Sequence, residues 1–345
     1  MDIFYDVPLA RLNTFRMKVQ AACLVEYDTA EELGGIPEDL PKPWKALGGG
    51  SNLLFTGDFP GTLLHSRIRF IQPVEMQEYV LVRVGSGACW DDLCAWAADH
   101  GLWGIENLSH IPGEVGAAAV QNIGAYGVEA ADVVDTVECY DLVERRFCRF
   151  SAAECGYGYR TSRFKEEWKD RYIVTAVGIR LAKEYSPKLD YGNVRTAAIR
   201  RFGAYEVETG SLTPSRVRET VIGIRREKLP EPEELGSAGS FFRNPIVPRE
   251  QYWQVLRKAG EEGLGEVPHY DAGELVKIPA AWLIEKCGWK GRREGNAGVY
   301  DRQALVLVNA TGQAAPGEIL SLEEKIKASV LDRFGIRLTP EVEHI

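Results

Sequence analysis

The sequence predicts an α+β protein, because strand patterns and helix patterns both occur along the chain without strict alternation. Apolar side chains alternate over 79–85, and residues 172–181 form a largely apolar run, and both patterns are typical of strands. Apolar side chains recur at three and four residues over 319–334, which is typical of a helix packed on a core. A chain of 345 residues is long enough for two or three domains. Changes in the pattern of apolar runs and turn signals place domain boundaries near 70 and 215.

The first two thirds of the chain are expected to carry mainly strands. Residues 1–70 mix short apolar runs with turn signals. One helix is expected from Trp90 to His100, with Gly101 as its stop, and Ser151 and Glu154 have capping-box spacing. Strands are expected at 79–85, 133–142 and 172–181.

The last third is expected to be richer in helices. Thr213 followed by Pro214 predicts a helix start, because proline suits the first helical position. Further helices are expected near 248–260 and 279–287, a strand at 304–309, and a last helix that Gly335 ends.

Composition excludes several classes of function. A net charge of −9 argues against nucleic acid or an anionic membrane as a general partner. No apolar run approaches the roughly 18 residues of a membrane span, and the N-terminus lacks the apolar segment of a signal peptide. The seven cysteines form no CxxC pair and the histidines show no ligand spacing, so we expect reduced thiols, no metal site and a cytoplasmic location.

Three segments are rich in small residues: Gly48–Asn52, Gly85–Gly87 and Ile111–Glu129. Glycine lets a backbone approach a ligand closely, and its N–H groups can converge on an anion. Plain hairpin turns are the alternative for the first two loops. None of the segments is a GxGxxG fingerprint or a phosphate-binding P-loop, so a phosphate-bearing cofactor would need another architecture. The length of the third segment suggests backbone lying along a flat ligand.

Six motifs together resemble the UDP-N-acetylenolpyruvoylglucosamine reductases, the flavoenzymes that complete UDP-N-acetylmuramate for bacterial peptidoglycan. They occur in that family's order and approximate spacing, and the resemblance covers the chain from about Leu12 to Ile345. QNIGAYG and GSFFRNP are together highly specific. The six motifs are GGGSNLLF, IPGEVGAAAVQNIGAYGVE, YGYRTSRFK, GSFFRNP, WLIEKCGWKG and LTPEVEHI.

The resemblance implies a two-part FAD-binding module of the vanillyl-alcohol-oxidase type, followed by a C-terminal α+β substrate-binding domain. We expect FAD-binding subdomains at 1–70 and 71–214 and the substrate domain at 215–345, with the end of the chain packing back on the FAD module. FAD would be bound without a covalent link. The implied FAD-binding residues are Gly49, Gly50, Ser51, Asn52, Gly113, Gly116, Gln121, Asn122, Gly124, Ala125, Tyr126 and Gly127.

The resemblance also implies the catalytic and substrate-binding residues. Arg160 matches the family's active-site arginine, Ser240 its proton donor and Glu341 its glutamate near the C-terminus. Positions that contact the UDP part or the carboxylate of the substrate are matched by Tyr191, Lys228, Asn244, Tyr270, Lys290 and Gln303. The two tyrosines suggest the subtype with a tyrosine-bearing loop over the substrate. NADPH as the reductant, using the substrate's pocket before substrate enters, follows from the resemblance alone.

The chemistry of this reduction is consistent with those residue types. Hydride addition to the enolpyruvyl group puts negative charge on the carboxyl-bearing carbon, which a cation such as Arg160 stabilises. Ser240 is a weak acid, so it needs an acceptor held in line and a relay, for which Glu341 is the candidate. Lys228 and Lys290 suit a nucleotide diphosphate on an otherwise acidic protein.

Each residue alone has a plainer interpretation: Arg160 as a surface ion-pair partner, Ser240 as a turn cap and Glu341 as a solvated acid. Their joint occurrence in one order favours the reductase. One alternative keeps the FAD module in an oxidase or dehydrogenase for another alcohol or acid, and the GSFFRNP segment argues against it. The other is a flavin- or nucleotide-binding regulatory protein, which should have lost one of the three residues. The sequence predicts no oligomeric state.

Overall fold

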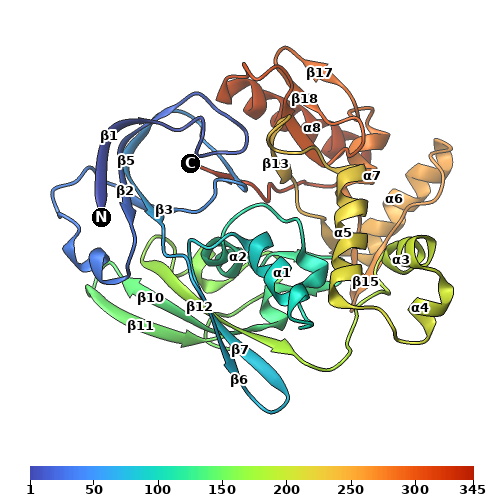
Figure 1. Ribbon diagram of the computed structural model, residues 1–345. Coiled ribbons are helices and arrows are strands. Elements are labelled where there is room, and N and C mark those ends of the chain that lie inside the picture. The colour runs from blue at the N-terminus through green and yellow to red at the C-terminus, as the bar shows by residue number, and fades with distance from the viewer. The chain divides into compact units, whose positions relative to one another are not determined.

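The computed structural model describes residues 1–345, and its contacts divide the chain into two compact units (Figure 1). Unit 1 comprises Met1–Val7, Ala21–Gly49 and Pro60–Arg226, and unit 2 comprises Pro8–Gln20, Gly50–Phe59 and Glu227–Ile345. Each unit therefore combines segments that lie far apart in the sequence. The domain boundaries expected near 70 and 215 stay predictions.

Unit 1 contains two larger sheets. The first has the order β1-β2-β5-β3, with β3 parallel to β5. The second has the order β11-β10-β12-β7-β6 and is antiparallel throughout. The strands of the first sheet are β1 (Asp2–Pro8), β2 (Gln20–Tyr27), β5 (Phe59–Ser66) and β3 (Trp44–Leu47). Those of the second are β11 (Arg146–Ser151), β10 (Val134–Asp141), β12 (Tyr172–Ala182), β7 (Tyr79–Gly85) and β6 (Ile71–Glu75).

The core of unit 1 lies on both faces of the second sheet. On one face Val82, Val137 and Ile179 pack with Trp90 and Leu93, all buried. On the other face Tyr140 and Ile173 join a cluster that includes strands β2 and β5 of the first sheet. The central strand β12 is buried along almost its whole length, as its continuous apolar sequence predicts.

Five helices complete unit 1: α1 (Trp90–Asp99), α2 (Val115–Gln121), α3 (Val194–Phe202), α4 (Ala204–Glu208) and α5 (Pro214–Lys228). The predicted helices from Trp90 and Pro214 are confirmed, whereas α3 and α4 had no counterpart among the predicted elements. Ser151 and Glu154 exchange the hydrogen bonds of a capping box, yet only a turn follows them. The short elements are η1 (Glu31–Gly35), η2 (Glu106–Leu108), β8 (Gly124–Ala125), β9 (Val128–Glu129), η3 (Ala130–Asp132) and η4 (Arg163–Lys165).

Helix α2 corrects our expectation that the backbone of 111–129 lies along a flat ligand over its length, because Val115–Gln121 is helical. Alanine is the best helix former, and Val115, Ala118 and Ala119 turn a buried face toward the second sheet. A Cβ at Gly116 would lie 2.8 Å from the Cβ of Ser86, so only glycine allows the helix to pack this closely. The small residues therefore serve helix packing as well as any ligand.

Unit 2 contains three small sheets, ordered β13-β19-β18-β17, β14-β16-β15 and β20-β4. The predicted helices near 248–260, 279–287 and 319–334 are confirmed. The helices are α6 (Arg249–Glu261), α7 (Ala280–Lys286) and α8 (Pro316–Phe334). The strands are β4 (Leu53–Leu54), β13 (Gly236–Ser240), β14 (Ile246–Pro248), β15 (Tyr270–Ala272), β16 (Leu275–Lys277), β17 (Arg293–Glu294), β18 (Ala297–Val299), β19 (Val306–Asn309) and β20 (Glu343–His344).

The end of the chain pairs with a segment near its start. Strand β20 runs parallel to β4, with Glu343 opposite Leu53, and Thr56 N–H donates to the carbonyl of Ile345. Since β3 pairs with β5 and β4 pairs with β20, the glycine loop 48–52 does not close a hairpin. The hairpin interpretation of that loop is wrong.

All seven cysteines are free thiols. No helix of the structure combines the length and the apolarity needed to cross a membrane.

Asp141 at the end of β10 provides a test of the fold. Its Oδ1 accepts hydrogen bonds from the backbone N–H of Val143 and Glu144, and Arg171 Nη2 donates to its Oδ2 at 2.7 Å. Burial alone raises the pKa of this carboxyl, but Arg171 and the two amides outweigh it and hold the pKa below its ordinary value. We expect Asp141→Ala to lower the free energy of unfolding by roughly 2–4 kcal/mol, measured by urea denaturation at pH 7.

The contribution of Asp141 to the free energy of unfolding should fall at low pH. A folded-state pKa below the unfolded one gives stability above the unfolded value, and this stability is lost as the pH falls through the folded value. The difference between wild type and Asp141→Ala should therefore narrow below about pH 4. Asp135→Ala, which breaks a more exposed ion pair with Arg180, is the control and should cost under about 1 kcal/mol. Equal losses in the free energy of unfolding of the two variants would contradict the stabilising role assigned to Asp141.

Candidate active site

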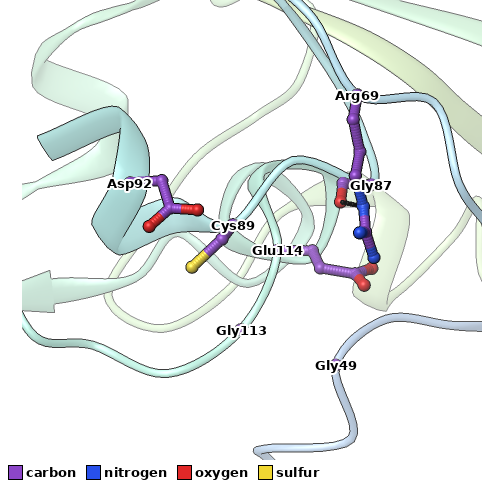
Figure 2. A pocket seen from close by; sticks show the side chains of 7 residues that line it. All are labelled: Gly49, Arg69, Gly87, Cys89, Asp92, Gly113 and Glu114. Carbon is purple, nitrogen blue, oxygen red and sulfur yellow. Dashed lines mark hydrogen bonds between the residues drawn. The ribbon is translucent and has the colours of Figure 1, made fainter. Parts of the chain in front are cut away.

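One cavity in unit 1 brings the small-residue segments together (Figure 2). Gly49, Gly87 and Gly113 each come from a different one of these segments, and all three line the cavity, whose volume is about 280 Å³. The remaining lining residues are Arg69, Cys89, Asp92 and Glu114. The loop at 85–87 thus belongs to this cavity, although it was not among the expected FAD-binding residues.

Close backbone contacts explain why these positions are glycine. A Cβ at Gly87 would lie 2.2 Å from the carbonyl oxygen of Ser66, and one at Gly49 would lie 3.2 Å from the Cα of Gly113. Gly113 also has a φ of 127°, a conformation that side chains disfavour. Larger residues would push the segments apart and distort the cavity.

Backbone hydrogen bonds join the segments around the cavity. Trp90 N–H donates to Gly113 O at 3.0 Å, Val115 N–H to Ala88 O at 2.9 Å, and Gly116 N–H to Ser86 O at 2.9 Å. The starts of α1 and α2 are therefore held side by side. Cys89 and Glu114, both on the cavity, form an isolated antiparallel bridge.

Arg69 is the cation of this cavity. Its Nε donates to Gly87 O at 3.1 Å, the dashed bond in Figure 2, and its other N–H groups have no partner within the protein. Free guanidinium donors beside closely packed glycine backbones fit an anionic group such as the diphosphate of FAD. Sequence reasoning missed Arg69, because a single arginine after a strand carries no local signal.

The second half of the small-residue segment surrounds Arg160, also in unit 1. Arg160 Nη2 donates to Gly124 O at 2.6 Å, and a Cβ at Gly124 would lie 3.2 Å from Arg160 Nη1. Buried Asn122, which caps α2 with a φ of 47°, donates to Gly158 O and accepts from Ala131 N–H. Asn122 therefore holds the Arg160 turn against this segment.

Tyr191 lies against the same segment. A Cβ at Gly127, where φ is 80°, would lie 3.1 Å from the Cβ of Tyr191. The buried Asn107 donates to the carbonyls of Tyr126 and Lys188 and so ties the two chain segments together. The fold thus brings one expected substrate residue, Tyr191, beside expected cofactor residues, and Asn107 is a further organising residue that the sequence did not reveal.

Unit 2 brings Ser240 and Glu341 close together. Ser240 ends β13 at an irregularity in its pairing with β19, after Gly239 with a φ of 68°. The next residue, Phe241, accepts a hydrogen bond from Glu341 N–H at 2.8 Å. Asn52 Nδ2 donates to Glu341 O at 3.3 Å, so the expected cofactor residue Asn52 is joined to the same segment as Glu341.

The other expected substrate residues of unit 2 have varied surroundings. Asn244 Oδ1 accepts from Ala280 N–H and so caps α7. Lys290 pairs with Glu285 at 3.2 Å, and the ammonium of Lys277 lies 5.3 Å from the ring centre of Tyr270. Gln303 Oε1 accepts from Leu305 N–H. Lys228, the last residue of α5, follows the boundary of unit 1 and belongs to unit 2.

Two family models match the chain. The FAD binding domain matches residues 22–145, and the C-terminal domain of UDP-N-acetylenolpyruvoylglucosamine reductase matches residues 231–345. The FAD-binding match covers all seven residues that line the cavity. The expected cofactor, FAD, is therefore supported by both sequence and cavity.

Proteins of the same name align over nearly the whole chain. A UDP-N-acetylenolpyruvoylglucosamine reductase from Bacteroides fragilis strain YCH46 is 45% identical over 337 residues, covering 96% of this chain and 97% of its own. One from Xylella fastidiosa strain M12 is 43% identical over 349 residues, covering 99% and 95%.

Solved structures agree on the fold. The reductase of that name from Thermus caldophilus superposes with a TM-score of 0.66 at 24% identity and covers 99% of this chain and 98% of its own. A 6-hydroxy-D-nicotine oxidase from Arthrobacter nicotinovorans superposes with a TM-score of 0.53 at 13% identity and covers 97% and 86%. The predicted α+β fold with an FAD-binding module of the vanillyl-alcohol-oxidase type is confirmed. With full-length relatives above 40% identity, the chain belongs to the UDP-N-acetylenolpyruvoylglucosamine reductase family.

Proposed function

We propose that this protein uses FAD and NADPH to reduce the enolpyruvyl group of UDP-N-acetylglucosamine enolpyruvate, giving UDP-N-acetylmuramate for peptidoglycan synthesis in the cytoplasm. The observation that carries the proposal is the cavity lined by Gly49, Gly87 and Gly113, in a chain 45% identical to a reductase of this name. The oxidase alternative finds support only in a fold likeness at 13% identity, which does not specify a substrate.

The first half of the proposed site holds the cofactor. Backbone groups of the three glycine segments and the free donors of Arg69 would take the diphosphate of FAD, with Gln121 to Gly127 beside the ring system. When bound, FAD supplies the hydride that NADPH first delivers to it. NADPH and substrate would use one pocket in turn, which implies ping-pong turnover.

The second half of the proposed site holds the substrate and handles the proton. Arg160 would bind the carboxylate and stabilise the negative charge that develops there, because its guanidinium is fixed by Gly124 O. Ser240 would donate the proton to the carboxyl-bearing carbon, with Glu341 acting on its relay. Contacts to the UDP part and the carboxylate are assigned to Tyr191, Lys228, Asn244, Tyr270, Lys290 and Gln303.

An absorbance experiment tests the function as a whole. Flavin bands of the purified protein should bleach with NADPH in the absence of oxygen and return when UDP-N-acetylglucosamine enolpyruvate is added. Bleaching without return would leave an FAD protein with another substrate. The absence of flavin bands after adding FAD would contradict the proposal.

Ser240→Ala should separate the two half-reactions. The variant should keep FAD and its reduction by NADPH, whereas reoxidation by substrate should slow by about 10²–10⁴-fold, because the proton donor is lost. Stopped-flow absorbance measures both steps. Ser237→Ala on the same strand β13 is the matched control and should keep both rates. Equal slowing of both steps in Ser240→Ala would exclude the role as a proton donor.

Tyr191→Phe should affect substrate binding alone. Loss of one hydroxyl hydrogen bond should raise the KM for the enolpyruvyl substrate by roughly 3–10-fold, with FAD content unchanged. The control is Tyr185→Phe, which alters a hydroxyl in the same segment on a ring that packs on Trp103. An unchanged KM in Tyr191→Phe would remove this tyrosine from the substrate contacts.

A further inference from the structure

His65 lies between two carboxylates at the edge of the cavity. Its Nδ1 is 3.0 Å from Glu26 Oε1 and its Nε2 is 3.0 Å from Glu114 Oε1. The three side chains come from β5, β2 and the residue before α2, and each is at most 20% exposed.

The geometry determines the charge of the imidazole. A neutral imidazole has one N–H, so one of its two nitrogens would direct a lone pair at a carboxylate oxygen. Only the imidazolium donates to both Glu26 and Glu114. Burial alone lowers the pKa of His65, but Glu114 and then Glu26 outweigh it, so the pKa lies above its ordinary value.

Among the neighbouring charged groups, His65 is the one that pairs with Glu114. Arg67 pairs with Glu26 Oε2, and also with Asp2 and Asp28, so Glu26 has a second cation. Tyr27 is close to Glu114, and burial raises the pKa of its phenol, so it stays neutral. His65 is the one cation that pairs with Glu114.

Glu114 connects this cluster to the cofactor site. It lines the cavity beside Gly113, and a Cβ at Gly49 would lie 3.9 Å from its Cγ. Asp92 adds a second acid to the lining, and Arg69 is the only cation there. An uncompensated Glu114 carboxylate would repel a diphosphate in this cavity and would be free to turn toward it.

We propose that protonated His65 is a positioning residue for FAD, because it neutralises Glu114 and holds the carboxylate away from the cofactor's diphosphate. This inference rests on the proposed use of FAD and names a group that acts on its affinity. His65 acts through Glu114, since Glu114 lines the cavity and His65 is not among its lining residues.

The proposal predicts how the affinity for FAD changes with pH. Bound diphosphate favours the charged imidazolium, so FAD binds best below the pKa of His65 and is released more readily as the pH rises through it. Loss of one charge-assisted hydrogen bond and exposure of the carboxylate should weaken FAD binding by about tenfold between pH 6 and pH 9.

The test measures the dissociation constant of FAD by its fluorescence when the holoprotein is diluted at pH 6 to 9. Wild type should show the tenfold rise. His65→Gln should bind FAD about tenfold more weakly at pH 6 and show no pH response, because glutamine is neutral at every pH and cannot offset the charge of Glu114. His100→Gln, an exposed histidine on the end of α1, is the control and should behave as wild type.

Glu114→Gln is the more decisive variant, because it should strengthen FAD binding, whereas His65→Gln should weaken it. Its amide can donate to neutral His65 while His65 donates to Glu26, so no proton is required. This variant should bind FAD at pH 9 about tenfold more tightly than wild type, again without a pH response. It decides the question even if His65→Gln fails to fold by circular dichroism.

Two results would overturn the proposal. One is a pH response that persists in His65→Gln and disappears in Cys89→Ser, which would assign the titration to the thiol in the cavity. The other is weaker FAD binding by Glu114→Gln at pH 9. Absence of FAD binding at every pH would instead contradict the proposed function itself.

Discussion

Direct backbone contact between glycine-rich segments is the constraint on which the candidate site depends. Trp90 N–H donates to Gly113 O and Gly116 N–H to Ser86 O, and a Cβ at Gly116 would lie only 2.8 Å from the Cβ of Ser86. Such contacts fix the starts of α1 and α2 to within a hydrogen-bond length. At Gly49, Gly87 and Gly113 the cavity wall is backbone, whose N–H groups do not change their charge with pH.

The charge in the cavity comes from a few side chains. The protein carries a net charge of −9, and Asp92 and Glu114 line the cavity itself. Arg69 supplies guanidinium N–H donors that have no partner within the protein, and His65 pairs with Glu114. Local pairing therefore decides whether an anion can enter, and the overall charge of the chain does not.

Much of the fold could be predicted because its elements have strong periodicity. Strand β7 and helix α8 follow their apolar patterns, and Gly101 and Gly335 adopt the positive φ angles expected beyond a helix end. Helix α2 was missed, because a run of glycine and alanine has no apolar period to reveal its buried face. Its burial depends on the sheet beneath it, which a local pattern does not contain.

The site was only partly predictable for a related physical reason. Family motifs located the glycine segments, whereas Arg69, His65 and Asn107 act through partners that are distant in the sequence. Asn107 joins carbonyls 19 and 81 residues away, and His65 pairs with Glu26 and Glu114 at separations of 39 and 49. Residues of this kind have ordinary local sequence contexts, and only the folded chain shows what they hold in place.

Backbone bonds position the two proposed proton-handling residues. Glu341 is placed through its N–H to Phe241 O and its carbonyl to Asn52 Nδ2, and Ser240 through the pairing of β13 with β19. None of these bonds uses the Ser240 hydroxyl. Because the pairing of β13 with β19 does not require that hydroxyl, its removal leaves the strands in register. A loss of reaction in Ser240→Ala then reports on chemistry. In the cofactor cavity the corresponding separation is harder, because the Glu114 carboxylate also pairs with His65.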